Sequence, residues 1–128
     1  MSSSSPAEGF VPGRHLLDAY GNGGFRFAEM SHRGSILVLP SGVRAWEVRE
    51  PLGLTAEAFA PVLAEAGLIE LLLIGTGLDL IPLRQPVRQR LRDAGLGIDV
   101  MQTGAAARTY NVLVAENRRV AAALIAVA

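Results

Sequence analysis

Cysteine and lysine are both missing from the 128 residues of this chain. Without cysteine it has no disulfide scaffold, thiolate zinc site, iron–sulfur cluster or cysteine nucleophile. Without lysine it has no Walker lysine, Schiff-base lysine or lysine general base. All twelve cations are therefore arginines, and twelve acidic residues balance them. This balance argues against a nucleic-acid-binding protein that relies on net positive charge.

Aromatic residues and long hydrophobic runs are also scarce. Aromatics make up 5% of the chain, so leucine, valine, isoleucine and alanine must build the core. The most apolar segments, 68–74 and 120–127, are far shorter than the ~20 residues that span a bilayer. We therefore expect a cytoplasmic protein, and contact with the periphery of the inner membrane stays open. The length predicts one α/β domain over 13–128, and the Ser- and Pro-rich segment 1–12 predicts a disordered tail.

The first half of the chain has the pattern of antiparallel strands. Segments 15–20 and 25–30 flank the run Gly-Asn-Gly-Gly at 21–24, which supplies the positive φ angles of a hairpin turn. The apolar segment 35–39 and the alternating segment 43–48 are separated by Pro-Ser-Gly. Together these segments predict a four-stranded antiparallel meander.

The second half alternates short apolar runs with helical spacing. Strands are predicted at 70–74, 97–101 and 119–127, and a helix that begins near Pro86 and another that begins at Thr103 connect them. Such a β-α-β-α-β unit forms a parallel sheet. The predicted fold is therefore α/β, and the N-terminal antiparallel strands either extend the parallel sheet or lie across one of its faces. A further helix begins at Ala56 with a kink, or nearer Pro61.

Five motifs follow one another along the chain: Gly-Asn-Gly-Gly-Phe at 21–25, Ser-Ile-Leu-Val-Leu-Pro at 35–40, Leu-Ile-Gly-Thr-Gly at 73–77, Thr-Gly-Ala-Ala-Ala-Arg-Thr-Tyr-Asn-Val-Leu at 103–113 and Glu-Asn-Arg-Arg-Val-Ala-Ala at 116–122. In this order and spacing they resemble a family of small domains of unknown function. That family includes the mitochondrial NADH dehydrogenase (complex I) assembly factor three and many bacterial and archaeal proteins. The resemblance covers about residues 15–127 and implies a three-layer domain with a mixed sheet and a role in building a respiratory complex.

A candidate ligand site lies where the parallel strands end. In open α/β sheets ligands bind at the carboxyl edge of the strands, and the start of a helix offers N–H groups to an anion. Each residue there also has a structural explanation: a tight turn, a helix cap, a solvated or ion-paired arginine, or an asparagine that ties the helix to the Gly75 turn. The candidate residues are Gly75, Thr76, Gly77, Thr103, Gly104, Arg108, Thr109 and Asn111.

A row of arginines is the second candidate feature. Arg84, Arg88 and Arg92 lie one helical turn apart, so they could bind an acidic protein surface or form a solvated helix face. The two histidines, His15 and His32, lack partners at the spacing of a metal site, so we expect no metal. We also expect no cofactor and assign no catalytic residue.

These observations favour a non-enzymatic protein-interaction domain. The resemblance points to subunits of respiratory complex I as partners. The alternative is a domain that binds a small anionic ligand, or an enzyme, with its site at the carboxyl edge of the parallel strands. We expect no nucleic-acid partner, and pairing of two copies through an apolar edge strand stays open.

Overall fold

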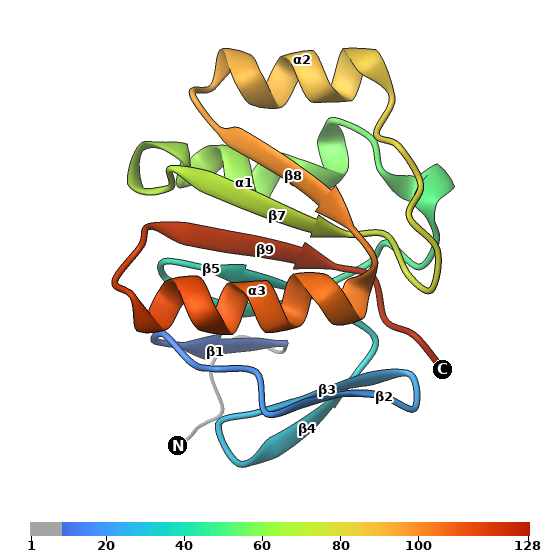
Figure 1. Ribbon diagram of the computed structural model, residues 1–128, viewed down its shortest axis with the longest axis vertical. Helices are drawn as coiled ribbons and strands as arrows, with labels where there is room; N and C mark the ends of the chain where they lie inside the picture. The colour runs from blue at the N-terminus through green and yellow to red at the C-terminus, as the bar shows by residue number, and fades with distance from the viewer. Residues whose placement is uncertain (1–8) are drawn as a thin grey trace.

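The computed structural model describes residues 9–128 (Figure 1). Single turns of 3-10 helix occur at η1 (Pro51–Gly53), η2 (Glu57–Phe59) and η3 (Ala66–Leu68). The strands and α-helices follow in the order β1 (Phe10–Pro12), β2 (Ala19–Gly21), β3 (Gly24–Phe27), β4 (Met30–Arg33), β5 (Ser35–Leu39), β6 (Gly42–Trp46), α1 (Ala60–Ala64), β7 (Leu71–Gly75), α2 (Gln85–Asp93), β8 (Gly97–Met101), α3 (Thr103–Ala115) and β9 (Val120–Leu124).

Six strands form a mixed central sheet in the order β1-β6-β5-β9-β7-β8. Strands β8 and β9 pair in parallel with β7, whereas β5 is antiparallel to both β9 and β6. The predicted parallel β-α-β-α-β unit is therefore confirmed. A second antiparallel sheet has the order β2-β3-β4.

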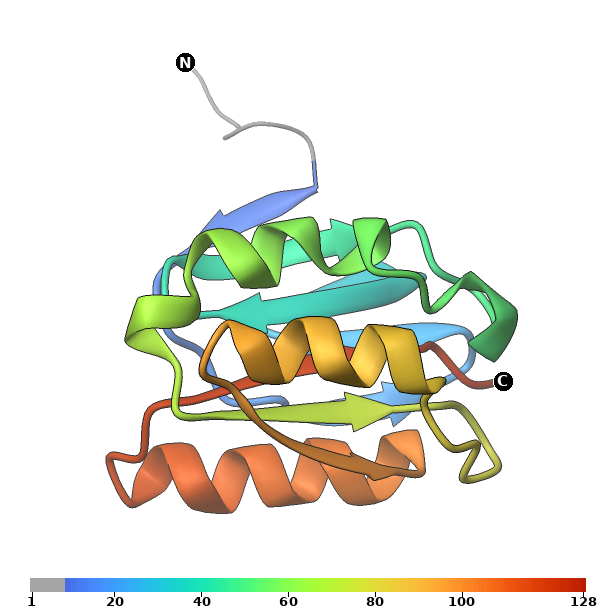
Figure 2. The same ribbon diagram turned by 90° about the horizontal axis from the view of Figure 1, so that it is seen from above.

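The central sheet lies between two layers, as the two views show together (Figures 1 and 2). One face packs against α1 and α2 through a cluster that includes Phe59, Val62, Val87 and Leu91. The other face packs against α3 and β3, and its cluster includes Tyr110. The three-layer α/β prediction is confirmed.

Local sequence accounts for these elements. All five residues of β5 and of β9 are buried, as expected for strands that are covered on both faces. Helix α2 has a proline in its first turn and buries Val87 and Leu91, which are four residues apart. Asn117 follows α3 with φ +61°, so it stops the helix as a left-handed residue. Helix α1 begins at Ala60, which supports the later of the two predicted starts.

Two sequence predictions are wrong in part. The predicted meander is divided between the two sheets, because Gly34 has φ +99° and redirects the chain between β4 and β5. Two of its hairpins are present, β2–β3 across residues 21–24 and β5–β6 across Pro40 and Ser41. The predicted disordered tail over 1–12 ends too late, because Phe10–Pro12 pair with β6 as strand β1. The rest of that prediction, residues 1–8, lies outside the described residues.

Within residues 9–128, every helix is too short or too polar to cross a membrane.

Candidate functional site

The carboxyl edge of the parallel strands brings the Gly75–Gly77 turn and the start of α3 together, as predicted. Thr103 is fully buried between them, where its hydroxyl donates to the Ile125 carbonyl at 2.7 Å and accepts from the Gly77 N–H at 2.9 Å. The Thr103 N–H donates back to the Gly77 carbonyl. Helix α3 begins at Thr103, and Gln102 is its N-cap residue. The prediction that Thr103 caps the helix is wrong, because its hydroxyl instead bonds the residues that follow β7 and β9.

Thr76 and Gly75 hold this turn in shape. The Thr76 hydroxyl donates to the Asp79 carbonyl at 2.5 Å and accepts from the Ile81 N–H at 3.1 Å, so it closes the loop that follows β7. A methyl group on Gly75 would lie 2.8 Å from the Thr103 Cα, which explains why this position is glycine. These polar groups are already satisfied by main-chain partners, and the ligand role proposed for them stays a prediction.

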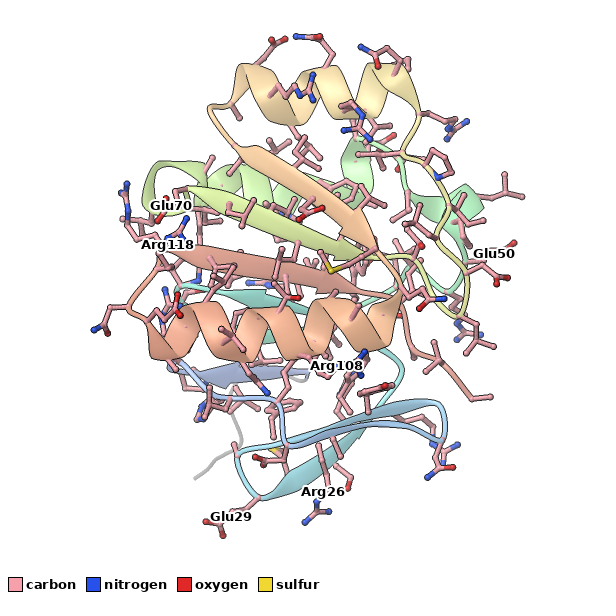
Figure 3. All side chains as sticks on the ribbon, viewed as in Figure 1. Arg26, Glu29, Glu50, Glu70, Arg108 and Arg118 are labelled. Carbon is pink, nitrogen blue, oxygen red and sulfur yellow. The ribbon has the colours of Figure 1, made fainter. Side chains whose placement is uncertain are left out.

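Arg108 lies one turn inside α3, at the surface, and its partner is a tyrosine that the sequence did not reveal. Its guanidinium donates from Nη1 to the Tyr20 hydroxyl at 3.0 Å. Tyr20 is 41% exposed, and its ring lies directly on Gly104, where a side chain would displace it. Figure 3 shows Arg108 between α3 and the β2–β3 hairpin. Tyr20 therefore covers the start of α3 at Gly104 and binds Arg108 one turn later.

The side chains of Asn111 and Thr109 contact segments other than the Gly75 turn. The Asn111 amide accepts from the Leu17 N–H at 2.8 Å and donates to the Leu17 carbonyl at 2.7 Å. The hypothesis that Asn111 ties α3 to the Gly75 turn is therefore wrong, since the side chain pairs with the segment before β2. Thr109 approaches the Met101 sulfur at 3.8 Å. Of the eight candidate residues, Thr103 and the Gly75–Gly77 turn form one hydrogen-bonded group, and Arg108 and Asn111 face other segments.

Two members of the predicted arginine row, Arg88 and Arg92, lie on α2, whereas Arg84 is the extended residue that precedes the helix and borders an apolar surface. Arg84 and Arg92 are exposed and Arg88 is half-buried. Leu52 of η1 and Ile81 of the loop after β7 line a groove with Arg84, and the same loop exposes Leu78 and Leu80; none of these four was a predicted site residue. Their exposed fractions are 77% for Leu52, 69% for Leu78, 55% for Leu80 and 39% for Ile81. We call these four residues the apolar end.

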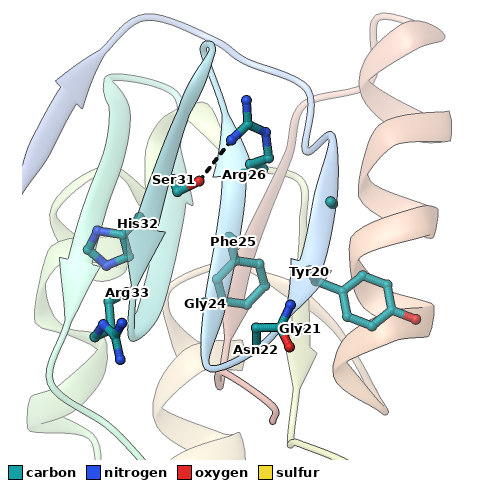
Figure 4. Close-up of a pocket in the computed structure, with 10 residues that line it drawn as sticks. Tyr20, Gly21, Asn22, Gly24, Phe25, Arg26, Ser31, His32 and Arg33 are labelled. Carbon is teal, nitrogen blue, oxygen red and sulfur yellow. Dashed lines mark hydrogen bonds between the residues drawn. The ribbon is translucent and has the colours of Figure 1, made fainter.

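A separate hollow of about 330 Å³ lies on the β2-β3-β4 sheet (Figure 4). Arg26 spans part of it, donating to the Ser31 hydroxyl at 2.9 Å, while the Tyr20 side chain points toward α3. His32 and Arg33 also line the hollow. Within residues 9–128, no group of three acidic or histidine side chains is close enough together to hold a metal ion.

Of the groups with displaced pKa values, Glu70 and Arg118 lie away from both candidate features, whereas Tyr110 lies on α3 between Thr109 and Asn111. Hydrogen bonds from the Arg118 side chain and from the Arg119 N–H lower the pKa of Glu70. The hydrogen bond to Glu70 in turn raises the pKa of Arg118. Glu70 and Arg118 lie at the opposite end of the molecule from Glu50 (Figure 3). Burial raises the pKa of Tyr110, and the charge of Arg14 opposes that rise.

Comparison with known proteins agrees with the motif resemblance. Residues 17–125 match the family described as protein of unknown function (DUF498/DUF598). An uncharacterized protein of Rhodobacter capsulatus is 37% identical over 121 residues, which cover 94% of this chain and 92% of the relative. A solved structure described as an outer membrane protein from Bartonella henselae has a TM-score of 0.88 and 53% identity, covering 91% of this chain and 98% of that one.

The relatives also include NADH dehydrogenase (ubiquinone) 1 alpha subcomplex assembly factor 3 of Mus musculus. It is 32% identical over 109 residues, which cover 85% of this chain. Because the match covers 59% of the mouse protein, this chain corresponds to only part of that factor. The resemblance inferred from the motifs is confirmed, and the chain belongs to the DUF498/DUF598 family, which includes complex I assembly factors and proteins of unknown function.

Proposed function

We propose that this chain is a non-enzymatic protein-interaction domain that helps to assemble a respiratory complex, with subunits of complex I as its partners. The observation that carries the proposal is the 32% identity to the mouse assembly factor over 85% of this chain. The apolar end supports it, because exposed groups of large apolar side chains commonly mark interaction surfaces. The proposal places the protein in the cytoplasm, with contact at the periphery of the inner membrane.

Capture from respiring cells tests this proposal. The tagged chain is crosslinked mildly in its own growing cells, purified, and its partners are quantified by mass spectrometry beside an untagged control. The proposal expects complex I subunits to be enriched over the control. Equal recovery of these subunits from tagged and untagged cells would contradict it.

The alternative is a small anionic ligand, or an enzymatic substrate, at the start of α3. The specific support is that Arg108 makes one hydrogen bond, to Tyr20, and lies beside Gly104 at the surface, so its other N–H groups can reach a ligand. Thermal unfolding with phosphate and with nucleotides tests this hypothesis. A ligand that raises the Tm of the wild type but not of Arg108→Ala would favour it, whereas unchanged Tm values would remove it.

A further inference from the structure

An apolar groove lies between η1 and the loop that follows β7, and two residues of the apolar end, Leu52 and Ile81, line it. It encloses about 240 Å³, and its residues are Glu50, Pro51, Leu52, Leu54, Ile81, Pro82, Leu83 and Arg84. Leu54 and Leu83 are buried, whereas Leu52 and Ile81 are exposed at its border. The groove therefore has a fixed apolar lining and an open side, which is the form of a pocket for an anchoring side chain.

The two loops meet at one end of the molecule, where the chain also ends (Figures 1 and 2). Leu78 and Leu80 extend the apolar surface from the groove along the loop after β7. Burial of apolar area stabilises an interface. Exposed leucines on both sides of a groove therefore favour the association of an apolar segment with this end.

Positive charge continues from the groove along α2. Arg84 lines the groove directly before α2 begins, and Arg88 and Arg92 follow on α2, one helical turn apart. Within the part of the chain that the structure describes, none of these three guanidinium groups forms an ion pair. Their charges are therefore available to carboxylates of a partner that lies along α2.

Acidic groups beside the leucines distinguish a protein partner from a membrane. Glu50 lines the groove, and Asp79 lies in the adjoining hollow with Leu78. Glu50 points away from the body of the molecule at this end (Figure 3). An anionic lipid surface would repel these two carboxylates. A folded protein segment avoids that repulsion when its acidic residues lie only along α2, beside the arginines.

We infer that the apolar groove and the arginine row together bind a helical segment of a partner protein. That segment carries large apolar side chains at helical spacing, which enter the groove, and then acidic residues one turn apart, which pair with the arginines. This inference rests on the proposed function, and it specifies which surface is used and the chemistry of the segment that occupies it.

Peptide display on the immobilised protein tests the inference. The probe is a library of helix-favouring peptides of about 16 residues, roughly four helical turns. Enriched peptides are synthesised, and their Kd is measured by fluorescence anisotropy. We expect the enriched peptides to share an apolar pair three or four residues apart, followed by acidic residues. An absence of enrichment, or enriched peptides without acidic residues, would overturn the inference.

Two variants and two controls locate the binding. Leu52→Ser and the triple change of Arg84, Arg88 and Arg92 to Gln should each raise the Kd about tenfold or more. The controls alter exposed residues elsewhere: Leu68→Ser, at a leucine that is 59% exposed, and Arg26→Gln should leave the Kd within about twofold. Circular dichroism verifies that each variant folds. Unchanged binding to the folded Leu52→Ser variant would overturn the inference.

Vesicles and cellular capture separate the remaining outcomes. Vesicles with about one-third phosphatidylglycerol in phosphatidylcholine should not sediment the protein. Sedimentation that Leu52→Ser abolishes would assign the groove to lipid and overturn the inference. If complex I subunits are captured equally by wild type and by both groove variants, the inference fails while the proposed function stands. If the peptides bind as expected but no subunit is captured, the proposed function fails while the groove remains a binding site for acidic helices.

Discussion

Asn111 should be among the most sensitive polar positions in the fold, because it joins α3 to a segment 94 residues earlier. Its amide makes two hydrogen bonds to the main chain of Leu17, at 2.8 and 2.7 Å, and Leu17 is itself 6% exposed. Each such bond contributes about 1 kcal/mol net, and main-chain groups left unpaired in a partly buried place cost more. We therefore expect Asn111→Ala to lower the free energy of unfolding by about 3 kcal/mol and the Tm by roughly 10 °C.

Urea unfolding followed by circular dichroism measures this loss, and a second variant identifies its cause. In Asn111→Asp the ionised carboxylate still accepts from the Leu17 N–H, but its other oxygen faces the Leu17 carbonyl without a proton between them. Protonation restores a donor, so folding raises the pKa of the new carboxyl above its unfolded value.

The sign of the pH dependence follows from that direction. A group whose pKa is raised by folding contributes stability below its unfolded pKa, and that contribution is lost as the pH rises through the folded pKa. Asn111→Asp should therefore be more stable than Asn111→Ala at about pH 4, and this advantage should shrink toward pH 7. A loss below about 0.5 kcal/mol for Asn111→Ala, or no difference in pH dependence between the two variants, would refute the reasoning.

Three further predictions concern stability. Gly75→Ala should lower the free energy of unfolding by about 2 kcal/mol, because the added methyl lies 2.8 Å from the Thr103 Cα; an unchanged Tm would contradict the close approach. Glu29→Gly should raise it by about 0.5–1 kcal/mol, since Glu29 adopts φ +60° in the β3–β4 turn, and a lower urea midpoint would argue against strain there. The hydrogen bond from Arg118 is the main cause of the lowered pKa of Glu70. The wild type should therefore be more stable than Glu70→Gln above pH 4.5, and this advantage should be lost as the pH falls through the lowered pKa. Paired urea titrations at about pH 7 and pH 3 measure the difference in unfolding free energy between the two proteins. A difference that is the same at both pH values would contradict a lowered pKa of Glu70.

The sequence predicted the elements whose signals are local. Continuous apolar runs identified β5, β7 and β9, and Pro86 and Thr103 marked the starts of α2 and α3, because burial on two faces and helix initiation depend on neighbouring residues. The division of the first four predicted strands into two sheets was missed. It depends on which surface each hairpin covers, and that information is not local.

The polar contacts of the candidate site were predicted less well for the same reason. The partners of Asn111 and Arg108 lie 94 and 88 residues away, and nothing near either residue in the sequence identifies them. The leucines of the apolar end did have a signal, because Leu78, Leu80 and Ile81 form an apolar group inside a predicted loop. Apolar residues in a loop have no helical or strand period to fit, so they are candidates for a surface that binds a partner.

The amount of assembled complex I in respiring cells that lack this chain is the most direct test of the proposed function. Native gel electrophoresis with an in-gel NADH dehydrogenase assay separates assembled complex from free subunits. The account predicts that assembled complex I falls without the chain, that wild type restores it, and that Leu52→Ser restores less than the matched control Leu68→Ser does. A normal level of assembled complex I in cells that lack the chain would contradict the account.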